Sequence, residues 1–354
     1  MVEKKASTRK SLYKEPAKKG NPYRQKNLAQ FQELIKNKQN ESTKFRRQFF
    51  QPDFRSVSAY ETSLVSYRKQ LKKLLGWPLT RAVKEKPCLR RRLRVGKDSL
   101  GVIERFWIDC GYGLSLYGLF FRPQSPGPVP LVISQHGGGG TPELTAGFFG
   151  SANYNEMTRR VLYRKVAVWA PQLFLWKKDF GPECDHLCLD RKLKHLGGSL
   201  AALEIYRLQR SLDILTRLPG IDKNKIGMIG LSYGGFYSLL LAAIDVRIKV
   251  TISSCYFNDR FLYDFGDWIW FNSANFFLDE ELACLVCPRP LYIEVGKKDP
   301  MFSAKTARPI ARLVAAVYKK LGVPRNFVYN EFQGGHELDR AEKNIDFLFR
   351  HLQD

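Results

Sequence analysis

The chain has 354 residues, of which 44% are hydrophobic, and a formal net charge of +24. This length allows one large domain with an extension, or two domains, and the apolar content is enough for a sizeable core. The charge is uneven, because residues 1–100 carry 27 Lys and Arg against 8 Asp and Glu, a net of +19. No run of 18 apolar residues occurs, which argues against a transmembrane helix and predicts no membrane partner.

Seven cysteines and a charged N-terminal segment argue against a secreted, disulfide-stapled fold. We therefore expect a cytoplasmic protein. Two interpretations remain for four of the cysteines: a zinc site that also uses His186, or buried thiols without a role, which we favour. The four are Cys184, Cys188, Cys284 and Cys287.

The basic N-terminal part, residues 1–86, is predicted to be a partly disordered and partly helical extension. Residues 1–25 are polar and look loosely attached. Apolar residues at helical spacing follow over residues 26–75, and Gly76-Trp77-Pro78 is expected to end the second helix. A basic segment binds nucleic acid or an acidic surface in some proteins, so residues 1–100 leave that alternative open. We favour a solvated extension and expect no nucleic acid partner.

Residues 87–354 are predicted to form one domain around a mainly parallel, twisted sheet. Residues 89–95 and 101–108 alternate or nearly so, and residues 113–121 are aromatic and aliphatic, which together predict three antiparallel strands. From residue 131 onward strands alternate with helices, which requires crossover connections and hence parallel strands flanked by helices. The further strands are expected at 131–134, 166–170, 225–231, 248–253, 290–295 and 326–331, and the helices at 155–163, 199–218, 304–321 and up to 352. Residues 172–195 and 256–287 look like insertions that cap the sheet edge.

The stretch of residues 225–243 predicts a strand, a sharp turn and a helix, with Ser232 at the apex of the turn. Gly230 and Gly234, two residues before and after the serine, let the strand and the helix approach closely. A hydroxyl held in this way is exposed at the sheet edge, beside helix N–H groups that can stabilise an oxyanion. We therefore predict that Ser232 is a nucleophile.

An acid and a histidine follow at the ends of the next predicted strands. Asp299 and His336 would meet Ser232 because the carboxyl ends of parallel strands share one edge of the sheet. The histidine would act as the base that serine needs, and the carboxylate would orient it. The alternatives are that Asp299 caps a helix, that His336 starts one, and that Asp259 is the acid instead.

A run of glycines after the strand at 131–134 predicts the second half of an oxyanion site. Gly137 or Gly138 would supply one N–H group and Tyr233 the other. The simpler alternative is a permissive loop. The substrate pocket would involve His136 and Trp176, together with the aromatic residues of the second insertion, which are equally suited to being its core. Those are Phe265, Trp268, Trp270, Phe271, Phe276 and Phe277.

The order His136-Gly137-Gly138, Gly230-x-Ser232-x-Gly234, Asp299 and His336 resembles the α/β-hydrolase fold. From Ser199 through the elbow, the sequence is similar to the dienelactone hydrolase and acetyl-xylan-esterase-like branch. One departure is Gln172, where many relatives carry Asp after Ala-Pro.

The resemblance implies a serine esterase that cleaves small acyl esters, of sugars or xenobiotics, without a metal or an organic cofactor. A peptidase is the lesser alternative, because the segment before residue 87 is too short for a propeller domain. A binding protein that uses the basic segment is the alternative from another class. The oligomeric state is not predicted.

Overall fold

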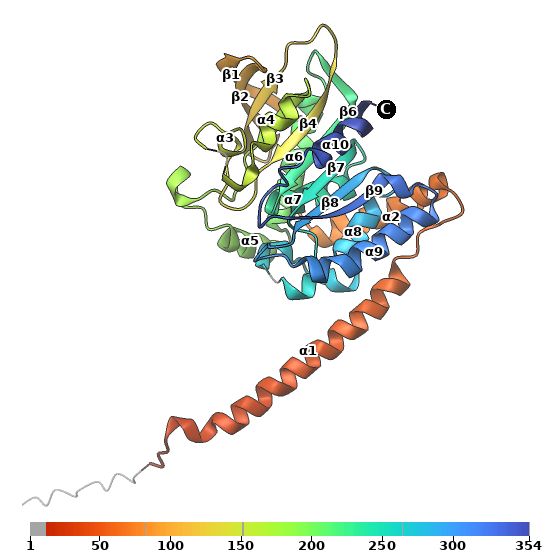
Figure 1. Cartoon of the computed structure of the whole chain (residues 1–354). Helices are drawn as coiled ribbons and strands as arrows, with labels where there is room; N and C mark the ends of the chain where they lie inside the picture. Colours follow the sequence, from red (N-terminus) through yellow and green to blue (C-terminus); the bar gives the residue numbers. More distant parts are fainter. Residues whose placement is uncertain (1–11, 82, 151, 264, 354) are drawn as a thin grey trace, which may run out of the picture.

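The computed structural model describes residues 12–81, 83–150, 152–263 and 265–353. Within these residues one sheet of nine strands crosses the molecule, in the order β1-β2-β3-β5-β4-β6-β7-β8-β9, with helices on both faces (Figure 1). The first three strands and the β3–β5 pair are antiparallel, and all the other pairs are parallel. The α/β-hydrolase fold that the sequence predicted is confirmed.

The strands lie close to their predicted positions. They are β1 Cys88–Asp98, β2 Gly101–Gly111, β3 Leu114–Arg122, β4 Val129–Gln135, β5 Ala167–Pro171, β6 Ile221–Leu231, β7 Ile248–Ser254, β8 Leu291–Gly296 and β9 Phe327–Phe332. The parallel strands β4, β5, β7 and β8 are almost wholly buried, as apolar strands between two helical layers should be, and β6 is buried from Ile226 to Leu231.

The helices divide the core into two parts, one on each face of the sheet. On one face pack α2 Val57–Leu75, α6 Leu200–Leu215, α7 Tyr233–Ile244, α8 Asp279–Val286 and α9 Ala304–Lys320. On the other face lie α3 Pro142–Thr145, α4 Met157–Leu162 and α10 Lys343–Gln353. Helix α2 contributes Tyr60, Leu64, Leu71 and Leu75 to the same core as α7, so it docks on the sheet domain as expected for an amphipathic helix.

Helix α1 (Asn21–Phe49) differs from the others, because it projects away from the body (Figure 1). Only Ser42 and Arg46 of its 29 residues are buried. Near its C-terminal end Arg46 Nε donates to Glu281 Oε1 at 2.8 Å, and the Phe49 ring packs on Phe276 with centroids 4.7 Å apart. These contacts fix the C-terminal end of α1 on the first turn of α8 and on the segment before it.

Two sequence predictions differ from the structure. Residues 17–25 are helical rather than disordered, and Pro22 sits in the first turn of α1, where its missing N–H costs nothing. Residues 1–11 of that prediction lie outside the described residues. The insertions also contain helices that the sequence pattern did not reveal, α5 (His186–His195) and α8. Among the described residues no helix combines the length and the apolar character needed to cross a membrane.

Candidate active site

Ser232 lies on a strained turn between β6 and α7. Its backbone has φ 59° and ψ −121°, a conformation that L-residues avoid and that persists only where the surroundings impose it. The surroundings here are a hydrogen bond from Ser232 N–H to Ser254 O at 2.8 Å and the start of α7, where Phe236 N–H donates to Ser232 O at 2.9 Å. The serine is therefore fixed at the carboxyl edge of the sheet.

The two glycines of the turn are required by close backbone approach. A Cβ at Gly230 would lie 2.3 Å from Gly234 O, and one at Gly234 would lie 2.2 Å from Gln135 O. No side chain fits at these distances, so strand β6, helix α7 and strand β4 can meet only with glycine at both positions. This is the physical content of the spacing that predicted the elbow.

His336 and Asp299 lie together at the same edge of the sheet. His336 Nδ1 is 2.9 Å from Asp299 Oδ2, and Asp299 Oδ1 accepts N–H groups from Met301 at 2.8 Å and Phe302 at 3.0 Å. Burial alone would raise the pKa of Asp299, but the hydrogen bond from His336, its charge and these N–H donors outweigh burial and hold the pKa below its ordinary value. The carboxylate is thus kept ionised beside the imidazole.

Strand β7 connects the serine to the histidine. Ser254, which accepts the Ser232 N–H, is followed by Cys255, whose Sγ lies 3.2 Å from Glu337 O and 3.8 Å from Gly335 O. These carbonyl groups flank His336. A donor atom of Cys255 also lies within 4.8 Å of one on Asp299 and one on His336. Burial raises the pKa of the Cys255 thiol well above its ordinary value, so it contributes as a neutral group that holds the histidine loop.

The glycine run supplies one free backbone donor. The N–H groups of Gly139 and Gly140 have backbone acceptors, and Gly137 N–H donates to the Tyr154 hydroxyl at 2.9 Å. Among the described residues this leaves Gly138 as the one member of the run whose N–H has no acceptor. A Cβ at Gly138 would lie 3.2 Å from the Tyr233 ring, so its backbone is beside the residue that follows the serine.

The prediction for Gly137 is therefore corrected, because its N–H is already engaged. Tyr233 opens helix α7, where backbone N–H groups lack an acceptor within the helix. An oxyanion next to Ser232 would have Tyr233 N–H and Gly138 N–H as its candidate donors.

His136 is a structural residue rather than a wall of the pocket, which corrects its predicted role. Its ring is fully buried, with Nδ1 2.8 Å from Gly137 O and Nε2 accepting the N–H of Leu173 at 2.9 Å. Burial lowers the pKa of His136 to about 4, so the ring is neutral and ties the glycine run to the segment after β5. Gln172, the departure noted in the sequence, lies beside it, with Nε2 3.0 Å from His136 Nε2.

A second histidine–aspartate pair lies beside the elbow, and sequence reasoning missed it. His186 Nδ1 is 2.9 Å from Asp267 Oδ2, and Asp267 Oδ1 accepts the hydroxyl of Tyr233 at 2.9 Å. The hydrogen bond to Asp267 raises the pKa of His186, and burial opposes it. His186 and Asp267 come from the two different insertions, so no local pattern could have joined them. Together they anchor the side chain of Tyr233, whose backbone follows the serine.

Of the six aromatic residues of the second insertion, Trp268, Trp270 and Phe277 are buried in the core, Phe276 is partly buried, and Phe265 and Phe271 are exposed. Trp268 and Trp270 are 1% and 2% exposed, and Phe271 is 87% exposed and lies in a groove beside α2. Trp268 nevertheless backs the site, since its ring lies 4.6 Å from that of Tyr233 and 5.7 Å from that of Phe302, which stacks on His336. The predicted role of Trp270 and Phe271 in a substrate pocket is not supported by these positions.

Trp176 lies at a cavity of about 360 Å³ next to the glycine run. Residue 176 pairs with Gly139 through an isolated bridge, which places the cavity one residue from Gly138. Its wall is both aromatic and polar, and includes Tyr117, Glu143, Phe149, Gln172 and Phe180.

Two alternatives from the sequence were Asp259 as the catalytic acid and a zinc site at the cysteines, and the structure gives these residues other positions. Asp259 caps the short helix Arg260–Leu262 through a bond from Phe261 N–H at 3.0 Å, and the partner of His336 is Asp299 instead. Cys284 and Cys287 are buried, and Cys184 Sγ lies 3.5 Å from Phe174 O. Within the described part of the chain these cysteines and His186 do not gather into a group of three metal donors.

Comparison with known proteins supports the fold. No protein-family model matches the chain. The curated "Putative hydrolase YtaP" of Bacillus subtilis strain 168 is 25% identical over 289 residues, covering 76% of this chain and 92% of that protein. A "putative acetyl xylan esterase" of Bacteroides fragilis superposes with a TM-score of 0.61 at 17% identity, over 80% of this chain and 79% of that one. A glucuronoyl esterase of Solibacter usitatus gives 0.64 at 14% identity, over 82% and 92%. These likenesses place the chain in the α/β-hydrolase fold.

Proposed function

We propose that the chain is a serine hydrolase that cleaves carboxylic esters through an acyl-enzyme. One observation carries the proposal: Ser232 stands at a strained elbow at the same sheet edge as a histidine whose Nδ1 is 2.9 Å from a buried carboxylate. Serine needs such a base at neutral pH, and the base needs an orienting group.

In the proposed mechanism His336 takes the proton of Ser232 as the hydroxyl attacks the ester carbonyl. Among the described residues no hydrogen bond joins the Ser232 hydroxyl to the His336 ring, and such contacts commonly tighten only when substrate is bound. Asp299 keeps the Nδ1 proton in place and stabilises the imidazolium that forms. The oxyanion is received by the N–H groups of Tyr233 and Gly138.

The histidine then returns its proton to the leaving alcohol, which departs and leaves the acyl group on Ser232. A water molecule deprotonated by His336 hydrolyses the acyl-enzyme and frees the acid. Every step uses side chains and N–H groups of this chain.

For the substrate we propose a chemical class and not a particular molecule. A putative acetyl xylan esterase and a glucuronoyl esterase occur among the structural neighbours, so we propose a small acyl ester, an acetylated sugar or a xenobiotic ester. We place part of the substrate in the cavity at Trp176, because Trp176 pairs with Gly139, the residue that follows the proposed oxyanion donor Gly138. A cytoplasmic location and the boundary between residues 1–86 and 87–354 stay predictions.

The test is hydrolysis of p-nitrophenyl acetate and butyrate by the wild type and by Ser232→Ala. We expect the variant to lose about 10³-fold or more in kcat, as removal of a nucleophile does. Labelling of the folded protein by a fluorophosphonate, located by mass spectrometry, separates an unsuitable ester from an inert site. An unlabelled Ser232 in folded protein would overturn the proposal and favour a binding role.

A further inference from the structure

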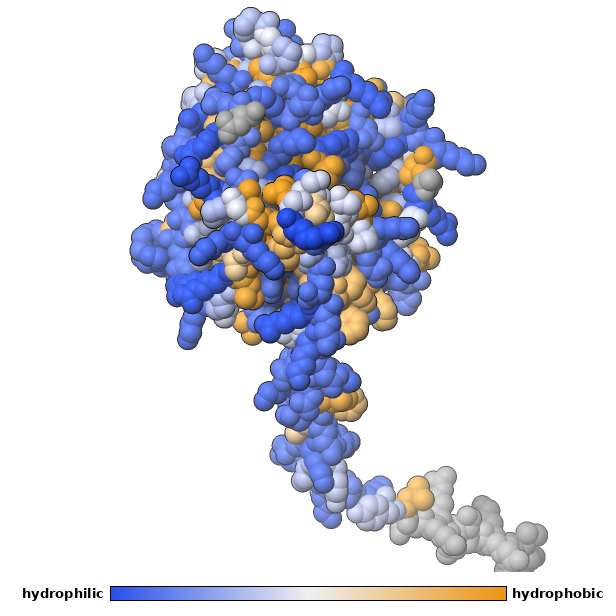
Figure 2. Space-filling view, turned by 90° about the vertical axis from the view of Figure 1, so that its right-hand side faces the viewer, coloured by the Kyte–Doolittle hydropathy of each residue, from blue (hydrophilic) through white to orange (hydrophobic). Residues whose placement is uncertain are grey.

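Helix α1 carries a mainly apolar seam from Leu28 to Phe49, interrupted by Lys38, and only its C-terminal half is covered. Residues on this seam recur at alternating steps of three and four, the spacing by which two helices pair side by side. The seam comprises Leu28, Phe31, Ile35, Lys38, Ser42, Phe45 and Phe49. Its last members rest on the body, whereas Leu28, Phe31 and Ile35 are 59%, 65% and 56% exposed. Figure 2 shows apolar side chains on this projecting arm.

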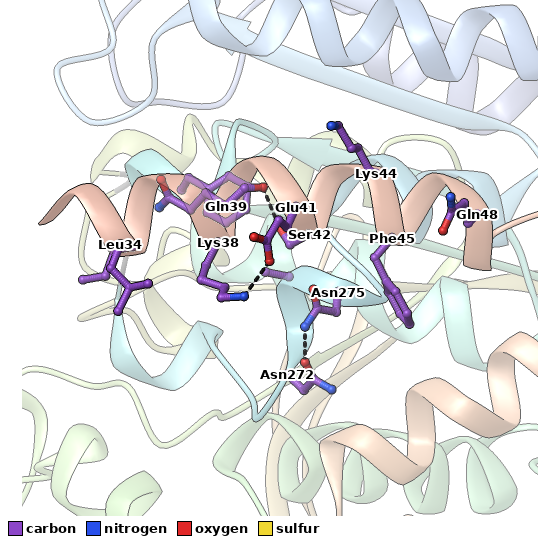
Figure 3. A pocket seen from close by; sticks show the side chains of 13 residues that line it. Leu34, Lys38, Gln39, Glu41, Ser42, Lys44, Phe45, Gln48, Asn272 and Asn275 are labelled. Atoms are coloured by element: carbon purple, nitrogen blue, oxygen red, sulfur yellow. Dashed lines mark hydrogen bonds and ion pairs between the residues drawn. The ribbon is translucent and has the colours of Figure 1, made fainter. Parts of the chain in front are cut away.

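A groove lies between the seam and the body, at the place where the covered half begins. Its volume is about 720 Å³, and it is lined on one side by α1 and on the other by the segment before α8 (Figure 3). From α1 it includes Ile35, Ser42 and Phe45, and from the body Phe261 and Asn275. The groove thus has apolar side chains on both sides, with Lys38, Glu41 and Lys44 also in its lining, and it continues an interface already formed within the chain.

The charges of α1 are arranged so that two copies of it can approach. The helix carries a net charge of +5 over residues 21–49, which would oppose self-association if the charges flanked the seam. The positions beside the exposed half are uncharged instead: Gln25, Asn27, Gln32 and Leu34. Lys26 and Lys36 lie on the opposite face, where they remain solvated in a pair.

We infer that the outer half of α1, residues 21–35, docks antiparallel against α1 of a second copy of this chain and fills the groove beside it. An antiparallel pair brings the Leu28 and Phe31 of each copy to the groove of the other, so one two-fold contact covers both exposed seams. A helix of 29 residues spans roughly 43 Å, which is long enough for its outer half to reach past the body of its own chain.

Other occupants fit the observations less well. Nucleic acid would be held by the basic face of α1 and would leave the apolar seam in water. An acidic membrane would require a strongly apolar face, whereas Arg24 and Lys38 interrupt this seam. A seam with helix-pairing spacing and neutral flanks is suited to another helix of the same kind.

The test is the mass of the full chain in solution, measured by light scattering after size exclusion across micromolar concentrations. We expect twice the chain mass for the wild type. Phe31→Gln combined with Ile35→Gln should raise the dimer dissociation constant by about 30-fold or more and give the monomer mass. The matched control, Lys26→Gln with Lys36→Gln, changes two residues of the opposite face and should remain dimeric.

The partner side of the contact is tested separately by Phe45→Gln, which alters the groove and should also weaken the dimer. Ester hydrolysis by the same variants should be unchanged, so this test is independent of the proposed function. A monomeric wild type, or a dimer that survives the Phe31 and Ile35 changes, would overturn the inference. Binding of RNA or anionic vesicles by a monomer, lost in the lysine variant, would identify another occupant.

Discussion

Among the residues that the structure describes, two histidine–aspartate pairs have the same geometry, and one of them is proposed to do chemistry. In each, a histidine Nδ1 lies 2.9 Å from an aspartate Oδ2, and the carboxylate is buried. His336 and Asp299 stand on loops after β9 and β8, at the same edge of the sheet as Ser232, which follows β6. His186 and Asp267 stand in the two insertions and contact the side chain of Tyr233 instead. The comparison teaches that the position on the sheet edge, rather than the pair itself, assigns the role of base.

The largest effect should come from removing the carboxylate of the pair at the sheet edge. Asp299→Asn keeps the shape but offers a donor where an acceptor is needed, so His336 is expected to change tautomer. We predict a loss of about 10³- to 10⁴-fold in kcat for p-nitrophenyl acetate. Asp267→Asn, the matched change in the other pair, should cost less than about 10-fold, because Tyr233 would donate through its backbone. Equal losses would contradict the assignment.

Within the described part of the chain, Glu294 is a buried carboxyl group without a histidine partner, and its pKa can be compared with that of Asp299. Glu294 of β8 is fully buried and contacts the amide of Asn344 at 3.1 Å and the N–H of Asp339 at 3.2 Å. Burial outweighs these neutral donors and raises the pKa of Glu294 to about 7, whereas the pKa of Asp299 beside its histidine is lowered. Burial alone thus favours the protonated acid, and the hydrogen bond to a histidine side chain reverses this for Asp299.

The consequence is a pH dependence of stability. Above about pH 4.3 the carboxyl is ionised in the unfolded chain but protonated in the folded one, so the folded state loses stability as the pH rises from there to about 7. Glu294→Gln removes this change. Urea unfolding at pH 5 and pH 8 should show the wild type losing up to about 3 kcal/mol more than the variant. The same loss in both proteins would show that Glu294 is ionised when folded.

The smallest effect concerns the second pair. The pKa of His186 is raised by Asp267, so the stabilisation from this pair is present below the ordinary histidine pKa and is lost as the pH rises through the raised value. His186→Gln should therefore destabilise the protein more at pH 5.5 than at pH 9. The difference should be below about 1 kcal/mol, since the His186 ring is partly exposed and solvent screens the pair. An NMR titration of His186 with a midpoint at or below about 6.5 would contradict the raised pKa on which this prediction depends.

Local patterns predicted the parts of the site that depend on backbone geometry. Three chain segments approach so closely at the elbow that positions 230 and 234 must be glycine, and this spacing of glycines can be recognised in the sequence. The same holds for the buried strands, whose apolar runs are continuous. The proximity of Asp299 to His336 followed from the rule that parallel strands end at one edge.

The rest depends on contacts between residues far apart in the chain. Gly137 and Gly138 look alike in sequence, and only the hydroxyl of Tyr154 distinguishes them by occupying one N–H. His186 and Asp267 meet because two insertions fold over the elbow. Trp268 and Phe271 are three residues apart, yet one is buried and the other exposed, because the insertion lacks a regular repeat that would assign its faces.

The most direct test compares the two histidines in one experiment. His336→Gln and His186→Gln remove an imidazole from pairs of the same geometry, and kcat/KM for p-nitrophenyl acetate is measured for both beside the wild type. The account predicts a loss of about 10³-fold or more for His336→Gln and less than about 10-fold for His186→Gln. A reversed order, or losses of the same size in folded proteins, would contradict the assignment of His336 as the base.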